Sequence, residues 1–213
     1  MKAILGTKLG MGQIYDNEGN AIPVTLVVCP PNVVTQVKSL DKDGYSAVQL
    51  GAGIKKALSK PVAGHVKNLG NIRWLREFHV AGEVPSPYTR GDAIDVSIFS
   101  EKDLVHVTGI SKGKGFQGVV KRHGFRGSPK THGTKNTLRA PGSIGSSFPQ
   151  HVRKGKRMGG RMGGDQTTKR MHIVKIDRGH NLVLLDGPVP GPKGGLVKIE
   201  EVKSQKSKVK IAS

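Results

Sequence analysis

The sequence predicts a mainly β fold of the α+β class, in which a long irregular segment interrupts a strand-rich body. Short apolar or β-branched runs alternate with turn signals over residues 1–111 and again over residues 166–213. Between them, thirteen glycines fall in residues 113–164, where neither helical nor strand periodicity persists. Because strands resume afterwards, we interpret residues 112–165, hereafter the arm, as an insertion into one body and not as a linker between two domains.

In the first part of the body, strands are expected where apolar or β-branched residues cluster between turn signals such as DNEGN, PPN and DKDG. The predicted strands are Met1–Leu9, Ile22–Cys29, Val33–Val37, Tyr45–Leu50, Ile72–Val80, Ala93–Phe99 and Asp103–Ile110. A short helix is expected over Ser59–Leu69, with Ser59 as its cap and Pro61 in its first turn.

After the arm, the run QTTKRMHIVKID predicts a strand, which the turn RGHN joins to a second strand in NLVLLDG. The segment GPVPGPKGG precedes a last strand in LVKIEEVK, and the basic tail SQKSKVKIAS is expected to be loose. Within the arm, the regular element expected is a short helix over Phe116–Arg122. An irregular stretch this long inside a domain is normally functional or disordered.

Positive charge is concentrated around the arm. The chain carries 35 Lys and Arg against 15 Asp and Glu, a formal charge of +20. Residues 112–170 hold 15 of these basic residues and one acid, Asp165, so this window alone carries +14. Such a segment cannot offset its ordering entropy by burying itself, so we expect a polyanionic partner, with nucleic acid first. Charge alone leaves open a solvated arm of unspecific affinity, or a general DNA- or RNA-compacting protein.

Membrane, disulfide and metal functions lack the residues that they need. We find no basic amphipathic helix for an anionic membrane, no spanning apolar run, and too short an apolar start for a signal peptide, which predicts a cytosolic protein. The single cysteine, Cys29, excludes a disulfide framework and a cysteine zinc site, and is expected to be a buried strand thiol. The arm histidines, His123, His132 and His151, have no zinc-site spacing.

Enzymatic functions are also disfavoured. Gly113, Gly115 and Gly118 form a G-x-G-x-x-G pattern, but no Asp or Glu follows until Asp165, so a turn that contacts RNA explains it better than a dinucleotide site. We find no paired carboxylates in the arm and no sequence context for an activated nucleophile. The sequence therefore predicts a protein that is not an enzyme and has no cofactor. The aromatics Phe116, Phe125 and Phe148 could stack on unpaired bases or pack against the body, and the sequence leaves both open.

Several strings, taken in order, resemble the bacterial type of the ribosomal protein L-three family. VTGISKGKGFQGVVKRHGF is followed by THG, RAPGSIG and KGKRMGGRMG, and ILGTKLGMGQIYDNEGNAIPVTLV and VTQVK also match. The resemblance spans nearly the whole chain. It implies a β-barrel body like those of translation factors, with a small α+β insertion over about residues 55–95. It also implies a non-catalytic, structural protein of the large ribosomal subunit in the cytoplasm.

The family resemblance implies that the arm threads through large-subunit (23S-type) rRNA toward the peptidyl transferase centre. It further implies early binding in assembly and contacts with neighbouring ribosomal proteins, without a small-molecule substrate. By position, the tip consists of Pro141, Gly142, Ser143, Ile144, Gly145, Ser146, Ser147, Phe148 and Pro149. The residues expected to bind rRNA are Lys112, Lys114, Lys121, Arg122, Arg126, Lys130, His132, Lys135, Arg139, Arg153, Lys154, Lys156, Arg157, Arg161, Lys169 and Arg170.

The chain departs from the family pattern at one place in the tip. Some bacterial members carry a methylated glutamine just after GSIG, where this chain has Ser146, Ser147 and Phe148. Gln150 lies nearby in a different local context. We therefore do not expect that modification here.

Overall fold

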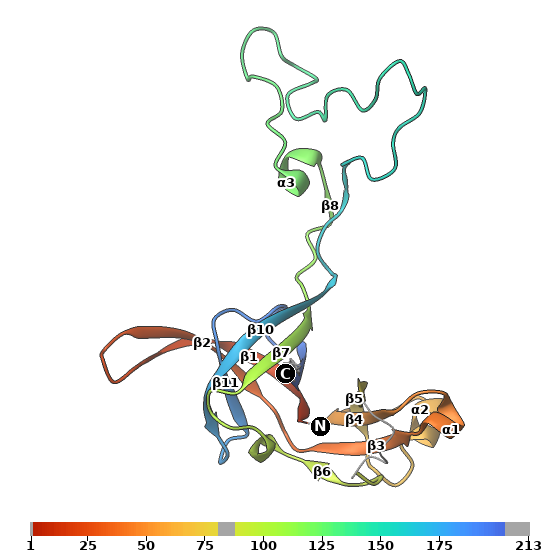
Figure 1. The fold of residues 1–213 in the computed structure, drawn as a ribbon, viewed down its shortest axis with the longest axis vertical. Helices are drawn as coiled ribbons and strands as arrows, with labels where there is room; N and C mark the ends of the chain where they lie inside the picture. Colours follow the sequence, from red (N-terminus) through yellow and green to blue (C-terminus); the bar gives the residue numbers. More distant parts are fainter. Residues whose placement is uncertain (1, 81–87, 203–213) are drawn as a thin grey trace, which may run out of the picture. The chain divides into compact units, whose positions relative to one another are not determined.

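The structure is a computed structural model that describes residues 2–80 and 88–202 (Figure 1). The expected loose tail, SQKSKVKIAS, lies outside these residues. The chain divides into two units, Met1–Ile110 with Gln166–Ser213, and Ser111–Asp165. The second unit differs from the predicted arm by one residue at its start. The prediction of a mainly β protein with few helices is confirmed.

Six strands of the first unit close into a barrel in the order β1-β12-β7-β10-β11-β2 (Figure 1). They are β1 (Ala3–Tyr15), β2 (Ala21–Val28), β7 (Leu104–Ile110), β10 (Gln166–Asp177), β11 (Leu182–Asp186) and β12 (Leu196–Glu201). Neighbouring strands are antiparallel throughout, and burial alternates along β7 and β12, as expected when every second side chain points inward. Ile4, Ile173, Leu185 and Ile199 are fully buried in the barrel core.

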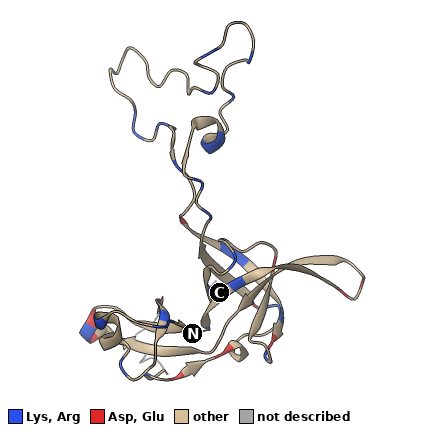
Figure 2. Ribbon diagram, turned by 180° about the vertical axis from the view of Figure 1, so that it is seen from behind, with Lys and Arg blue, Asp and Glu red and all other residues tan. Residues whose placement is uncertain are grey.

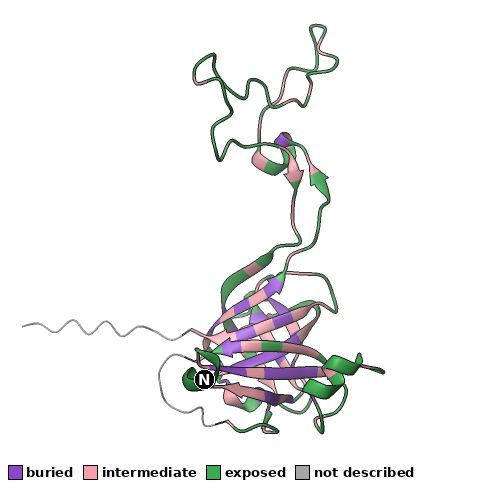
Figure 3. Cartoon of the chain, turned by 90° about the vertical axis from the view of Figure 1, so that its right-hand side faces the viewer, coloured by how far each residue is buried: buried purple, intermediate pink, exposed green. Residues whose placement is uncertain are grey.

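A four-stranded antiparallel sheet lies beside the barrel in the order β5-β4-β3-β6. Its strands are β3 (Asn32–Lys38), β4 (Ala47–Ile54), β5 (Ile72–His79) and β6 (Ala93–Ile94), with short helices α1 (Leu40–Asp43) and α2 (Lys60–His65) between them. Alternate residues of β1 serve two cores, because Ile4 belongs to the barrel core while Leu5 packs with the sheet residues Leu50 and Phe78. Figure 3 shows the buried residues gathered in these strands. The sheet begins earlier in the chain than the predicted insertion at about residues 55–95.

Asn32 connects the barrel to the sheet through a fully buried side chain. Its Oδ1 accepts a hydrogen bond from the Leu5 amide at 3.2 Å, and its Nδ2 donates to the Leu5 carbonyl at 3.1 Å and to the Pro30 carbonyl at 2.9 Å. The pairing of β1 with β2 begins only at Thr7, so the Asn32 amide bonds the backbone of Leu5 before that ladder starts. A buried backbone group without such a partner would be costly.

Most predicted strands are present, and the differences have local causes. The predicted strand Ala93–Phe99 is wrong beyond Ile94, where β6 ends. The next residue, Asp95, accepts a hydrogen bond from the Ser97 amide at 2.9 Å through its carboxylate. That cap starts the 3-10 helix η1 (Val96–Ile98) in place of a strand. The predicted helix Ser59–Leu69 ends earlier, at His65, and its cap Ser59 makes no side-chain hydrogen bond.

Candidate nucleic-acid interface

The base of the arm is a short antiparallel ladder. The strand β8 (Phe116–Gln117) pairs with β9 (Gly160–Arg161). The backbone pairing continues from Lys114 N to Met162 O at 2.8 Å and from Ser111 N to Asp165 O at 2.9 Å. Gly163 has φ +71°, and a Cβ there would collide with the Lys112 carbonyl, so the close approach of these two backbone segments requires glycine.

The predicted helix Phe116–Arg122 is shifted in the structure, where α3 spans Val119–His123 and ends at Gly124 with φ 72°. Two side chains of α3 meet one carbonyl across the ladder. Arg122 Nη1 and His123 Nε2 lie 3.1 Å and 3.0 Å from Met158 O. A Cβ on Gly160 would collide with the Arg122 guanidinium, so glycine makes room for this clamp. Arg122 was predicted to bind rRNA, and the structure gives it a contact inside the arm.

Between α3 and β9 the arm consists of turns and irregular backbone. The Ser128 amide donates to the Leu138 carbonyl at 3.1 Å and closes one loop. In the predicted tip, Ser143 Oγ donates to the Gly145 carbonyl at 2.7 Å. Val119 is the buried hydrophobic residue of this unit, and Phe116 and Phe148 are 76% and 86% exposed. Within its described residues the arm therefore lacks a core that could stabilise its shape.

The basic side chains of the arm are all exposed. The arm has thirteen Lys and Arg residues, all of them exposed, and a single acid, Asp165. Figure 2 shows where the basic and acidic residues lie along the chain. At most one of these cations can therefore be neutralised by a carboxylate of the arm itself. His132 and the predicted Lys169 and Arg170 are exposed as well, but Lys169 and Arg170 belong to β10 of the first unit. Lys169 Nζ donates to the Pro188 carbonyl at 3.0 Å there.

The tip lies next to basic residues that follow it in the chain. A hollow of about 240 Å³ is lined by Ser143, Ile144, Gly145, Ser146, Pro149, His151, Arg153 and Lys156. Arg153 and Lys156 therefore share one surface with the tip backbone. Lys130, His132 and Lys135, which precede the tip in the chain, do not line this hollow. The exposure of Phe148 leaves its ring available for stacking on a base, and that role stays a prediction.

Lys121 and Arg122 form a matched pair that separates RNA contact from structure. Lys121 is exposed beside Arg122, whose guanidinium holds Met158 O. Lys121→Ala should make the plot of log RNA affinity against log salt concentration less steep by about 0.9 per lost phosphate contact, without loosening α3. Arg122→Ala should in addition speed hydrogen exchange at the amides of residues 122–124 in the free protein. Equal exchange in the two variants would contradict the clamp.

A second basic segment, residues 44–76, was missed by the sequence analysis. No Asp or Glu occurs between Asp43 and Glu77, although this window holds six basic residues. All six are exposed on or around α2 and β5, namely Lys55, Lys56, Lys60, Lys67, Arg73 and Arg76. The absence of Asp and Glu between Asp43 and Glu77 could have indicated this segment. The larger positive charge of the arm drew attention away from it.

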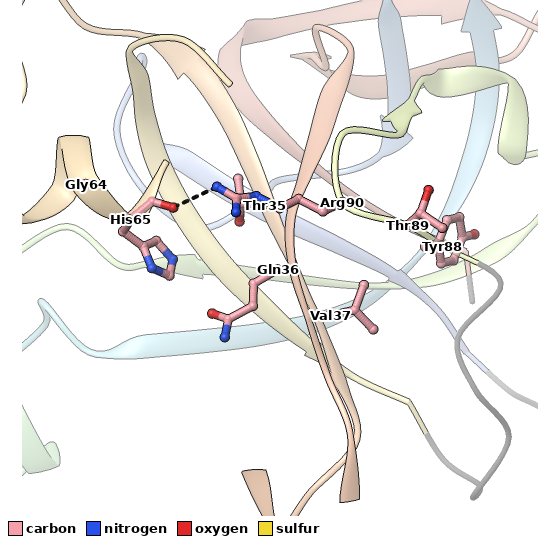
Figure 4. A pocket seen from close by; sticks show the side chains of 8 residues that line it. All are labelled: Thr35, Gln36, Val37, Gly64, His65, Tyr88, Thr89 and Arg90. Carbon is pink, nitrogen blue, oxygen red and sulfur yellow. Dashed lines mark hydrogen bonds between the residues drawn. The ribbon is translucent and has the colours of Figure 1, made fainter. Parts of the chain in front are cut away.

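A hollow on the sheet of the first unit has no catalytic arrangement among its lining residues. It encloses about 600 Å³ and is lined by Thr35, Gln36, Val37, Gly64, His65, Tyr88, Thr89 and Arg90 (Figure 4). Arg90 Nη2 donates to the His65 carbonyl at 3.2 Å, and His65 Nε2 lies 2.7 Å from Gln49 Oε1. These polar groups are used in holding neighbouring segments together.

Cys29 is fully buried, and burial raises the pKa of its thiol to about 12, so it stays protonated and unreactive at neutral pH. The described part of the chain contains no group of three or more His, Cys, Asp or Glu that could hold a metal ion. None of the helices in residues 2–80 and 88–202 is long and apolar enough to cross a membrane.

Comparison with known proteins identifies the family. The profile of the ribosomal protein L3 family matches residues 91–181. Large ribosomal subunit protein uL3 of Geobacillus stearothermophilus is 46% identical over 214 residues, which cover 98% of this chain and 99% of that protein. The proteins of the same name from Nostoc sp. and Chlorobaculum tepidum are 48% and 47% identical, over 94% and 93% of this chain and 96% and 98% of their own. With this identity along almost the entire length, the chain belongs to the ribosomal protein L3 family.

Proposed function

We propose that this chain binds large-subunit rRNA through its arm and holds distant rRNA segments together. One observation carries the proposal. The thirteen basic side chains of the arm are exposed on a segment that has one acid and one buried hydrophobic residue. Such a segment gains its shape from a partner that supplies negative charge, and rRNA phosphates supply it densely.

Family membership gives the setting. As a ribosomal protein of the L3 family, the chain is a protein of the large ribosomal subunit in the cytoplasm and not an enzyme. The finer assignments are part of our proposal. The chain joins the subunit early in assembly, contacts neighbouring ribosomal proteins, and directs the tip, Pro141–Pro149, toward the peptidyl transferase centre. The likeness of its closed barrel to those of translation factors is proposed on the same grounds.

The chemistry of the arm fits a phosphate backbone. Arg139, Arg153 and Arg161 can each bind phosphate oxygens through two parallel hydrogen bonds, while lysines act as point charges. Glycines with positive φ, such as Gly142 and Gly155, give the arm turns that other residues rarely adopt, which suits a path that follows phosphates closely. Neutralising phosphates in this way reduces the repulsion that would keep rRNA helices apart.

Reversing two charges in the arm tests the proposal. Lys154→Glu combined with Arg157→Glu should strongly impair assembly into large subunits and leave the melting temperature of the body nearly unchanged. Both side chains are exposed, and exposed substitutions usually change stability by only about 0.5 kcal/mol. Sedimentation of subunits and thermal melting of the isolated variant measure the two effects. A large fall in melting temperature would show that these residues are misplaced.

Specificity for rRNA is tested by competition. We expect the chain to bind a large-subunit rRNA fragment more tightly than duplex DNA of equal length at about 150 mM salt, where unspecific phosphate contacts are weakened. Equal affinity would favour a general compacting protein over the proposed function.

A further inference from the structure

The β1–β2 hairpin continues beyond the barrel as a two-stranded ribbon. β12 pairs with β1 only over residues 3–7, and β11 pairs with β2 only from Val24 onward. Among the described strands, Leu9–Tyr15 therefore have only β2 as a strand neighbour, and Ala21–Ile22 have only β1. These residues and the turn between them are called the ribbon (red in Figure 1). A two-stranded ribbon alone is marginally stable in water, so a partner that covers it would stabilise it.

One face of the ribbon carries exposed apolar side chains around one polar residue. Met11, Gln13 and Tyr15 lie on the same side of β1, where Met11 and Tyr15 are 52% and 65% exposed and Gln13 Nε2 donates to the Tyr15 hydroxyl at 2.9 Å. Leu9, at the register shift where the ribbon begins, is 55% exposed. Pro23, opposite Gln13, is exposed on the same face and adds further apolar surface. Neighbouring exposed apolar side chains on a protein rich in charge mark an interaction surface better than single ones do.

The charge of the ribbon is opposite to that of the rest of the chain. No Lys or Arg occurs between Lys8 and Lys38, and the turn carries Asp16 and Glu18. Asp16 is ionised at neutral pH, and hydrogen bonds from the backbone and the side chain of Asn20 lower its pKa further. In a chain of +20, this is a local negative surface that repels RNA phosphates and attracts cations.

We propose that the ribbon is a docking surface for a basic segment of another protein. An apolar side chain of that segment covers Met11 and Tyr15, while its Lys or Arg side chains meet Asp16 and Glu18. The inference rests on the proposed function, because proteins that share one particle with rRNA must themselves be largely cationic. It assigns to the ribbon a protein contact, in contrast to the RNA contacts proposed for the arm.

Photo-crosslinking in purified large subunits tests the contact. A photoreactive phenylalanine analogue replaces Tyr15 in one variant and Phe148 in a second. From position 15 we expect an adduct that resists ribonuclease and contains a net basic peptide of another ribosomal protein, identified by mass spectrometry. An adduct with rRNA, an adduct with a second copy of this chain, or the absence of any adduct would overturn the inference.

The label at position 148 keeps the two proposals apart. Under the proposed function it should form adducts with rRNA, whatever the result at position 15. Failure at position 148 alone counts against the proposed function of the arm, and failure at position 15 alone counts against the docking ribbon.

Charge reversal tests the chemistry of the partner. Asp16→Lys with Glu18→Lys, in the chain labelled at position 15, should lower the yield of the protein adduct by about tenfold, because like charges face each other across the contact. Asp41→Lys with Asp43→Lys makes the same change of charge on the exposed helix α1 and should leave the yield unchanged. An undiminished yield in the Asp16 and Glu18 variant would refute a basic partner.

Discussion

Removal of residues 126–163 should leave a folded, soluble body that has lost most of its affinity for large-subunit rRNA. Both hydrophobic cores consist of residues of the first unit, so the deletion removes no core contact. It does remove nine of the thirteen basic residues of the arm. The slope of log affinity against log salt should become less steep by about 6–8 if all nine contact phosphates. Binding titrations at several salt concentrations, with circular dichroism of the body, measure both outcomes.

A matched control separates charge from chain length. Replacing the same nine Lys and Arg by Gln keeps the glycines and the length of the arm, and should weaken binding nearly as much as the deletion. If the Gln variant binds like the natural chain, shape and not charge holds the rRNA. If the deleted chain enters subunits normally, the arm is not the main rRNA-binding element, and the second basic segment, residues 44–76, becomes the better candidate.

Asn32→Ala should be among the most destabilising single substitutions in the body. The fully buried Asn32 amide bonds both the amide and the carbonyl of Leu5, so alanine leaves two backbone groups without these partners. Each such group costs about 1–3 kcal/mol, so the free energy of unfolding should fall by about 2–6 kcal/mol in total. Urea unfolding of the natural chain and the variant, monitored by circular dichroism, gives this difference.

Two further variants define the cause. Asn32→Asp keeps the size and the acceptor but loses the donor to the Leu5 carbonyl, and should also destabilise the protein at neutral pH. Asn71→Ala removes an exposed amide that donates to the Lys56 carbonyl at 3.2 Å, and should cost less than about 1 kcal/mol. If Asn32→Ala and Asn71→Ala lower the free energy of unfolding by similar amounts, the burial of the Asn32 side chain does not determine how much its hydrogen bonds stabilise the protein.

The strands that the sequence predicted well are those with a local pattern. β7 alternates buried and half-buried residues along LVHVTGI, and β12 does so along LVKIEE, so periodicity alone locates them. β1 continues through GMGQIY to Tyr15, which its glycines conceal, because only pairing with β2 extends it. The 3-10 turn at Asp95 depends on one side-chain hydrogen bond, which no window of hydrophobicity records.

The candidate interface was predictable to a similar degree. Counting charges located the arm, because Lys and Arg without acids need no structure to be recognised. The separate role of Arg122 was not predictable, because its partner Met158 lies 36 residues away and is brought near by the β8–β9 ladder. The shared surface of Arg153, Lys156 and the tip likewise depends on the path of an irregular backbone, for which no periodicity exists.

The place of β12 in the barrel has a consequence for synthesis of the chain. β12 is the last of the described strands in sequence, yet it lies between β1 and β7, so the barrel cannot close until residues 196–201 have been made. During translation, the cationic arm therefore leaves the exit tunnel before the body has a complete fold. Pairing the two ends of the chain is a slow, non-local step. Newly made protein thus passes through a stage with an exposed polycation and an open sheet edge.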